Sequence, residues 1–141
     1  MQNRQYIAIV GGIIVAGAFS FIFDTLGKLM YPSTFPTDLS ALTKEGRLNL
    51  IEQMPFMAKV YSLIGSAVAA FVGAAISTFV SGRKDIKPML AVETVLFAFA
   101  VMKMLANPYP AWIWVLTPVA YFVLGYLTYK FLKKNDAEII E

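Results

Sequence analysis

Glu93 is the side chain of this sequence with the clearest capacity for chemistry, because it is an acid within a long apolar stretch. Residues 89–106 contain only two charged side chains, Glu93 and Lys103. A charge at the centre of a membrane costs about 2.5–3.5 kcal/mol or more, so an acid there usually binds a proton, a cation or a partner charge. Glu93 lies near the start of the stretch. Pairing with Lys87 or Arg83 is therefore one interpretation, and a proton or cation site is the other.

Lys103 lies near the other end of the same stretch. It follows Glu93 by ten residues, which in a helix is about 15 Å along the axis and about 80° around it, so the two are not expected to pair. Its long side chain can reach the membrane surface or pair with Asp24 or Glu52. We expect Asp24, Glu52 and Lys59 to form a charged cluster at this end, which either anchors loops or binds an ion.

The sequence contains few other residues or motifs that support catalysis. The chain has no cysteine and no histidine, which excludes disulfides and thiol catalysis and removes the commonest general base and metal ligand. No phosphate-binding, serine-nucleophile or zinc-protease motif occurs. We therefore expect no enzyme, no cofactor and no metal, and the dispersed lysines predict no nucleic-acid partner. A lipid-modifying enzyme is a third alternative, and it would depend on Asp24, Glu52 and Lys59.

The elements that must position these side chains are helices that cross a membrane. The chain has 141 residues, of which 58% are hydrophobic, and four apolar stretches are each long enough to span a bilayer. We predict an all-α membrane protein, a bundle of four transmembrane helices at about residues 6–24, 57–80, 89–106 and 111–132. The first stretch contains Ala16-Gly17-Ala18, similar to a signal cleavage site. It stays apolar up to Phe23, so we expect a retained helix.

The polar segments connect and end these helices. Residues 25–55 form the longest one, a partly helical outer segment with Thr37 or Asp38 as a helix N-cap. This segment either covers the end of the bundle or offers a docking surface to a partner. Residues 133–141 form a polar tail. Pro118 is expected to kink the last helix.

Small residues recur at intervals of four in the first two predicted helices. They are Gly12, Ala16 and Ser20 in the first, and Gly65, Ala69, Gly73 and Ser77 in the second. Such rows allow helix backbones to approach closely in lipid, so we expect the second helix at the centre of the bundle. The large aromatic residues are expected to face lipid, with a quinone-like ligand or a partner helix as alternatives; they are Phe97, Phe99, Tyr121 and Phe122.

The positive charges predict the orientation of the chain. With the amino terminus inside, seven Lys and Arg residues fall on the cytoplasmic side and five on or near the other side. Because cytoplasmic loops carry an excess of Lys and Arg, both termini are expected to be cytoplasmic.

The layout of the chain resembles a broad group of small bacterial four-helix integral membrane proteins that have no assigned activity. The shared features are Tyr31-Pro32, Met54-Pro55 before a Gly/Ala/Ser-rich helix, the basic connector 81–88, and Asn107-Pro108-Tyr109-Pro110-Ala111-Trp112. This resemblance implies a location in the bacterial inner membrane. The chain is also similar in size to dimeric small multidrug exporters, but these carry their essential glutamate in the first helix. Residues 6–23 here carry no charge.

Two functions follow as expectations. The first is a non-catalytic accessory or scaffolding subunit of a larger membrane complex, held in the lipid by small-residue faces to other subunits or to copies of itself. The alternative is a small homo-oligomeric transporter or channel that uses Glu93, since four helices are few for a complete transport path.

Overall fold

The computed structural model describes residues 2–32, 42–82, 85–107 and 109–138, and most of these residues lie in helices. These ranges contain short turns but no β-strand. The elements in chain order are α1 (Gln2–Met30), α2 (Lys44–Gln53), α3 (Phe56–Ser81), α4 (Lys87–Ala106), α5 (Ala111–Pro118), the π-helix η2 (Val119–Val123) and α6 (Leu124–Glu138). The predicted all-α class is confirmed for these residues.

Four helical stretches are long and apolar enough to cross a membrane. They are Asn3–Met30, Phe56–Ser81, Lys87–Ala106 and Ala111–Lys134, and the shortest has 20 residues. At about 1.5 Å per residue, a helix of that length reaches about 30 Å, the thickness of the hydrocarbon core of a bilayer. The last stretch joins α5, η2 and most of α6.

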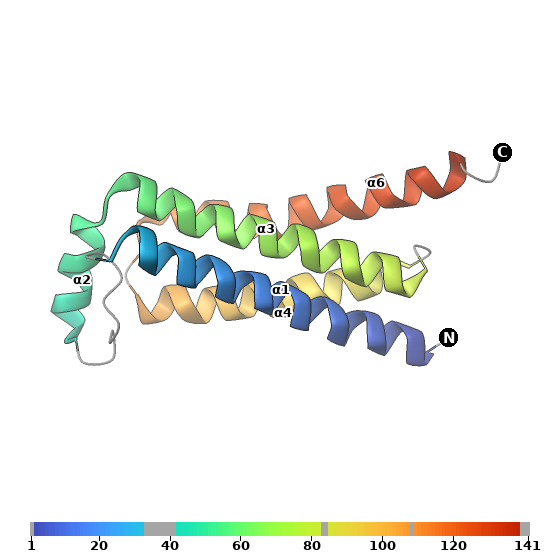
Figure 1. Ribbon diagram of the computed structural model, residues 1–141, viewed down its shortest axis with the longest axis horizontal. Coiled ribbons are helices and arrows are strands. Elements are labelled where there is room, and N and C mark those ends of the chain that lie inside the picture. Colours follow the sequence, from blue (N-terminus) through green and yellow to red (C-terminus); the bar gives the residue numbers. More distant parts are fainter. Residues whose placement is uncertain (1, 33–41, 83–84, 108, 139–141) are drawn as a thin grey trace.

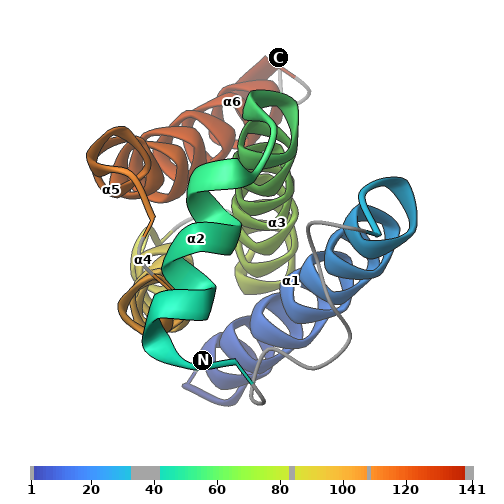
Figure 2. The same ribbon diagram turned by 90° about the vertical axis from the view of Figure 1, so that its left-hand side faces the viewer.

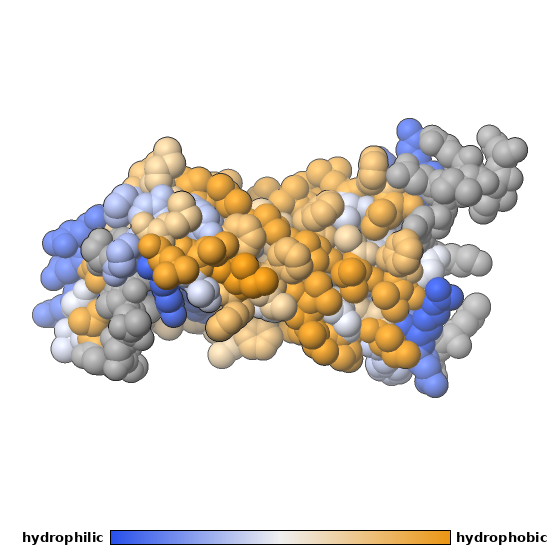
Figure 3. All heavy atoms as spheres, in the orientation of Figure 1, coloured by the Kyte–Doolittle hydropathy of each residue, from blue (hydrophilic) through white to orange (hydrophobic). Residues whose placement is uncertain are grey.

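These four stretches lie side by side, and α2 lies across one end of them (Figure 1). We call this end the α2 end. The start of α1 and the end of α6 lie at the opposite end, which we call the terminal end. Hydrophobic residues cover the middle of the face seen in Figure 3, and hydrophilic residues gather towards both ends. This distribution suits helices that pass through an apolar layer.

Small residues bring α1 and α3 into close contact. A Cβ atom added to Gly12 would lie 3.1 Å from the carbonyl oxygen of Gly73, and one added to Gly73 would lie 3.2 Å from Cβ of Ala16. A Cβ atom added to Gly65 would lie 3.1 Å from Cβ of Phe23. The small-residue rows of the two helices therefore pack against each other within one chain.

The core lies between α1, α3, α4 and η2. Its main buried cluster consists of Ala16, Ala69, Ala70, Val92, Leu96 and Tyr121. A second cluster, nearer the terminal end, consists of Ala74, Met89 and Tyr129. Ser77 is buried and donates a hydrogen bond from Oγ to the carbonyl oxygen of Ala74 (3.1 Å), whereas Ser20 is half-buried.

Helix α1 continues past residue 24, where the prediction ended it, and stops at Met30. The prediction stopped at Asp24 because a charge is costly in an apolar helix, but Asp24 has an ion-pair partner on α4. The helix ends where Pro32 disfavours helical geometry at the preceding residue, Tyr31.

Helix α2 begins at Lys44, with Thr43 as its N-cap. The hydroxyl oxygen of Thr43 accepts a hydrogen bond from the backbone N–H of Gly46 at 3.2 Å, which satisfies one of the free donors of the first turn. The N-cap expected at Thr37 or Asp38 lies outside the described residues.

Pro118 is the last residue of α5 within the last apolar stretch, and the kink expected there stays a prediction. Because proline has no N–H, the carbonyl oxygen of Trp114 one turn earlier loses its helical donor. The chain continues as the π-helix η2, which carries Tyr121. Single π-helical turns are frequent at functional sites.

Candidate functional site

Glu93 is the one fully buried charged side chain in the described parts of the protein. Its exposed fraction is 0%, and neither carboxylate oxygen has a hydrogen-bond partner there. It lies about 9 Å along α4 from Lys87, at about 1.5 Å per residue. Because a buried charge without a partner is strongly unfavourable, the carboxylate has to be neutralised by a proton or a bound cation.

Gly125 of α6 makes the room that Glu93 occupies. A Cβ atom added to Gly125 would lie 2.9 Å from Cγ, 3.0 Å from Cδ and 3.3 Å from Oε1 of Glu93. Any larger residue at this position would therefore displace the carboxyl group. The sequence analysis missed Gly125, because it lies outside the small-residue rows and only its contact with α4 distinguishes it.

Apolar layers enclose Glu93 on both sides along α4. One turn towards the terminal end, Met89 packs with Ala74 and Tyr129. In the other direction, Leu96 belongs to the main buried cluster. The carboxyl group thus lies between two layers of packed side chains.

The ion pair that the sequence suggested between Glu93 and Lys87 is absent. Lys87 is exposed, and Glu93 has no bonded partner among the described residues. Six residues turn a helix by about 240°, so the two side chains leave α4 in different directions. Arg83, the other suggested partner, lies outside the described residues. Lys87 therefore does not compensate the burial of Glu93.

Lys103 and Asp24 form an ion pair that links α4 to α1 at the α2 end. Nζ of Lys103 lies 2.8 Å from Oδ1 and 2.9 Å from Oδ2 of Asp24. Asp24 is one of the two partners that the sequence suggested for Lys103. The side chains of Lys103 and Asp24 are 49% and 52% exposed, and exposed pairs typically contribute about 0–1 kcal/mol to stability. The pair is therefore open to other polar groups.

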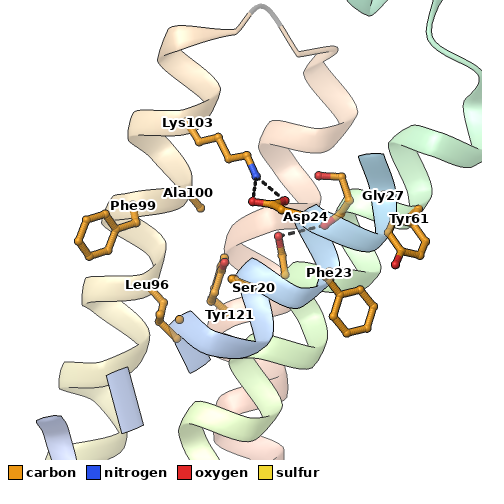
Figure 4. A pocket seen from close by; sticks show the side chains of 14 residues that line it. Ser20, Phe23, Asp24, Gly27, Tyr61, Leu96, Phe99, Ala100, Lys103 and Tyr121 are labelled. Atoms are coloured by element: carbon orange, nitrogen blue, oxygen red, sulfur yellow. Dashed lines mark hydrogen bonds and ion pairs between the residues drawn. The ribbon is translucent and has the colours of Figure 1, made fainter. Parts of the chain in front are cut away.

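A cavity of about 260 Å³ lies beside this ion pair, between α1, α3 and α4 (Figure 4). Lys103 reaches across its edge to Asp24, and Ser20 lies below the pair. The large side chains that line the cavity are those of Phe23, Tyr61, Leu96, Phe99 and Tyr121. The cavity is therefore mostly apolar, with its charges at one edge.

Tyr121 connects this cavity with the surroundings of Glu93. It lines the cavity, yet its exposed fraction is only 4%, so it does not face lipid as the sequence suggested. Its ring packs against Phe97 with centroids 6.4 Å apart. Tyr121 shares the main buried cluster with Val92 and Leu96, which lie next to Glu93 and about one turn from it on α4. Polar groups thus follow one another from the α2 end inward: the ion pair, Tyr121 and Glu93.

Glu52 and Lys59 form no ion pair with Asp24 among the described residues. Glu52 is exposed on α2, Lys59 is half-buried in α3, and neither has an ion pair with Asp24 in the described structure. The described residues also contain no group of three acids that could hold a metal ion. The ion pair that the structure shows at this end joins Asp24 to Lys103, and the larger cluster stays a prediction.

Tyr109 lies between α4 and α5, close to the same ion pair. Burial raises the pKa of the Tyr109 phenol above its usual range, and the charge of Asp24 adds to this effect. The positive charge of Lys103 and a hydrogen bond with Ser62 act in the opposite direction. Because burial is the largest cause, the phenol stays protonated to higher pH than an exposed tyrosine.

Comparison of the chain with family models, curated proteins and solved structures finds no match in any of the three.

Proposed function

We propose that the protein is a small transporter or channel in which Glu93 binds and releases the proton or cation that moves. The observation that supports this most is the complete burial of an unpaired carboxyl group between two apolar layers. Ionisable residues inside membrane helices are costly, and those without a structural partner commonly serve ion or proton pathways. The proposal includes no enzymatic activity.

The groups around Glu93 suit a carboxyl that changes its charge. When it carries a proton or a cation, the apolar layers on either side are compatible with it. Release requires that water or a polar group reaches the carboxylate. Tyr121 lines the cavity and lies on the π-helical turn η2, whose hydrogen bonding departs from that of a regular helix. We propose that movement at η2 opens a path from the cavity to Glu93.

A complete path is proposed to need more than one copy of the chain. Helix α1 packs mainly on α3, and only 17% of its most apolar 18-residue segment is buried. A Cβ atom added to Gly11 of α1 would have no other atom within 4 Å, so the face of α1 around Gly11 is open. This open face of α1 can accept a helix of a second copy. We place the assembly in the bacterial inner membrane, with both termini cytoplasmic and the α2 end outside.

Ion flux in proteoliposomes tests this proposal. Glu93→Gln keeps the size of the side chain but removes its titratable group. The matched control is Glu45→Gln, which changes an exposed acid on α2. We expect Glu93→Gln to lower the flux of protons or monovalent cations to the level of empty vesicles, and Glu45→Gln to leave it unchanged. Full flux from a folded Glu93→Gln protein contradicts the proposal.

The accessory or scaffolding subunit is the second candidate function, and the open face of α1 also favours it. The small-residue row of α3 no longer supports an external partner, because α1 covers it within the chain. Gly11 would instead be the point of close approach for a helix of another subunit.

Purification in mild detergent through a tag after Glu141 separates the two functions. Stoichiometric recovery with the subunits of one membrane complex supports the accessory function. A homo-oligomer without other proteins supports the transporter. A stable monomer that carries no other protein contradicts both.

A further inference from the structure

The cavity between α1, α3 and α4 opens towards the side of the molecule. Gly17 and Phe99 both line it, and both are exposed. In Figure 2, the end of α1 nearest α2 stands apart from α4. Closer to the terminal end, α1 and α4 are in contact, because a Cβ atom added to Gly12 would lie 2.9 Å from Val92. In a membrane, this side opening would face the acyl chains of lipid rather than water.

The charges at the edge of the cavity are balanced. Nζ of Lys103 binds both oxygens of Asp24, at 2.8 and 2.9 Å, and about half of each side chain is exposed. A ligand with one charge would be attracted by one of these groups and repelled by the other. A ligand with both charges can place its anion beside Lys103 and its ammonium group beside Asp24.

The walls of the cavity determine the rest of the ligand. Leu96 and Phe99 are apolar, and Figure 4 shows them away from the ion pair, along α4. The volume of about 260 Å³ is slightly below the range of about 300–1,000 Å³ for pockets that enclose a drug-sized molecule. It therefore suits a headgroup with the first carbons of its chains, while the remaining chain lies outside.

We propose that this cavity binds the headgroup of a zwitterionic phospholipid, with the phosphate beside Lys103, the ammonium group beside Asp24, and the start of an acyl chain against Leu96 and Phe99. This site is separate from Glu93, which does not line the cavity. The proposal does not depend on the transport function.

Native mass spectrometry of the delipidated, detergent-solubilised full chain tests the proposal. Short-chain phosphatidylethanolamine is compared with phosphatidylglycerol of the same chains and with free phosphoethanolamine. We expect at least tenfold tighter binding of phosphatidylethanolamine than of either other compound. Equal binding of the two lipids contradicts the charge argument. If free phosphoethanolamine binds as tightly as phosphatidylethanolamine, the acyl chains do not contribute to binding, which contradicts a lipid as the occupant.

Substitutions locate the binding site. We expect Lys103→Gln and Asp24→Asn each to weaken phosphatidylethanolamine binding at least tenfold, whereas Lys28→Gln, an exposed control on α1, leaves it unchanged.

Two substitutions by phenylalanine test the site by size, without changing a charge. Ala100→Phe fills the cavity, whereas Ala98→Phe adds the same ring at an exposed position that does not line it. We expect only Ala100→Phe to abolish binding. Thermal unfolding shows which variants are folded, and full binding by a folded Ala100→Phe protein overturns the proposal.

Discussion

Replacement of Glu93 by methionine is expected to stabilise the protein, although Glu93 is completely buried. Methionine has a similar length and no charge, so it can occupy the space beside Gly125 that Glu93 occupies. This space is narrow, because a Cβ atom added to Gly125 would lie 2.9 Å from Cγ and 3.0 Å from Cδ of Glu93. Its new neighbours, such as Met89, are apolar. The substitution removes a buried carboxyl group whose two oxygens have no partner in the described structure.

The size of the effect follows from that missing partner. A buried polar group without a hydrogen bond costs about 1–3 kcal/mol, so Glu93→Met should raise the free energy of unfolding by about that amount. By contrast, a Glu93 held in a buried ion pair would leave its partner charge unpaired after the same substitution. That would lower the free energy of unfolding by about 3–5 kcal/mol.

Reversible unfolding in mixed micelles, with sodium dodecyl sulfate as denaturant, measures this difference. Glu45→Met is the control, because Glu45 is exposed on α2 and a surface change of this kind should stay within about 0.5 kcal/mol. A loss of stability of more than about 1 kcal/mol in Glu93→Met, with the control unchanged, would refute an unpaired Glu93. If the Glu93 variants are more stable but no longer support ion flux, Glu93 is a functional residue that lowers the stability of the protein.

Four further substitutions test other contacts by the same unfolding measurement. Gly125→Ala should lower the free energy of unfolding by about 1–3 kcal/mol, because the added Cβ atom lies 2.9 Å from Cγ of Glu93. Gly11→Ala should raise the free energy of unfolding by about 0.5–1 kcal/mol, because alanine favours a helix and its Cβ atom has no other atom within 4 Å. Lys103→Met should cost less than about 1 kcal/mol, with a difference from the wild type that shrinks as salt is added. Burial raises the pKa of Tyr109, so its contribution to stability is complete below about pH 10 and is lost as the pH rises through the folded value. Tyr109→Phe should therefore give a flatter decline of stability above about pH 10, and an unchanged decline would contradict this role of Tyr109.

The positions of the long helices could be predicted because apolar runs of this length have few alternatives to a helix that spans a membrane. The end of α1 was less predictable. Asp24 ended the predicted helix, since the sequence alone does not show that Lys103 of α4 compensates its charge. Pro118 indicated a kink, but the sequence did not indicate that the π-helix η2 would follow it directly.

The candidate site could be predicted only in part. Glu93 was identifiable by its type within an apolar run, but its missing partner depends on the direction in which the side chain leaves α4. The roles of Gly125 and Tyr121 appear only when α6 and η2 are placed against α4. The small-residue rows indicated close helix packing, and the structure shows that the partner of α3 is α1 of the same chain.

Infrared difference spectroscopy of the carboxyl group tests most directly whether Glu93 exchanges a proton or a cation. The protein is reconstituted in lipid, and the carboxylic C=O band is followed as the pH is changed or a cation is added. We predict a band that changes in the wild type and in Glu45→Gln but is absent from Glu93→Gln. A spectrum in which no carboxyl band responds to pH or to cations, or in which the responding band persists in Glu93→Gln, would contradict the proposed function of Glu93.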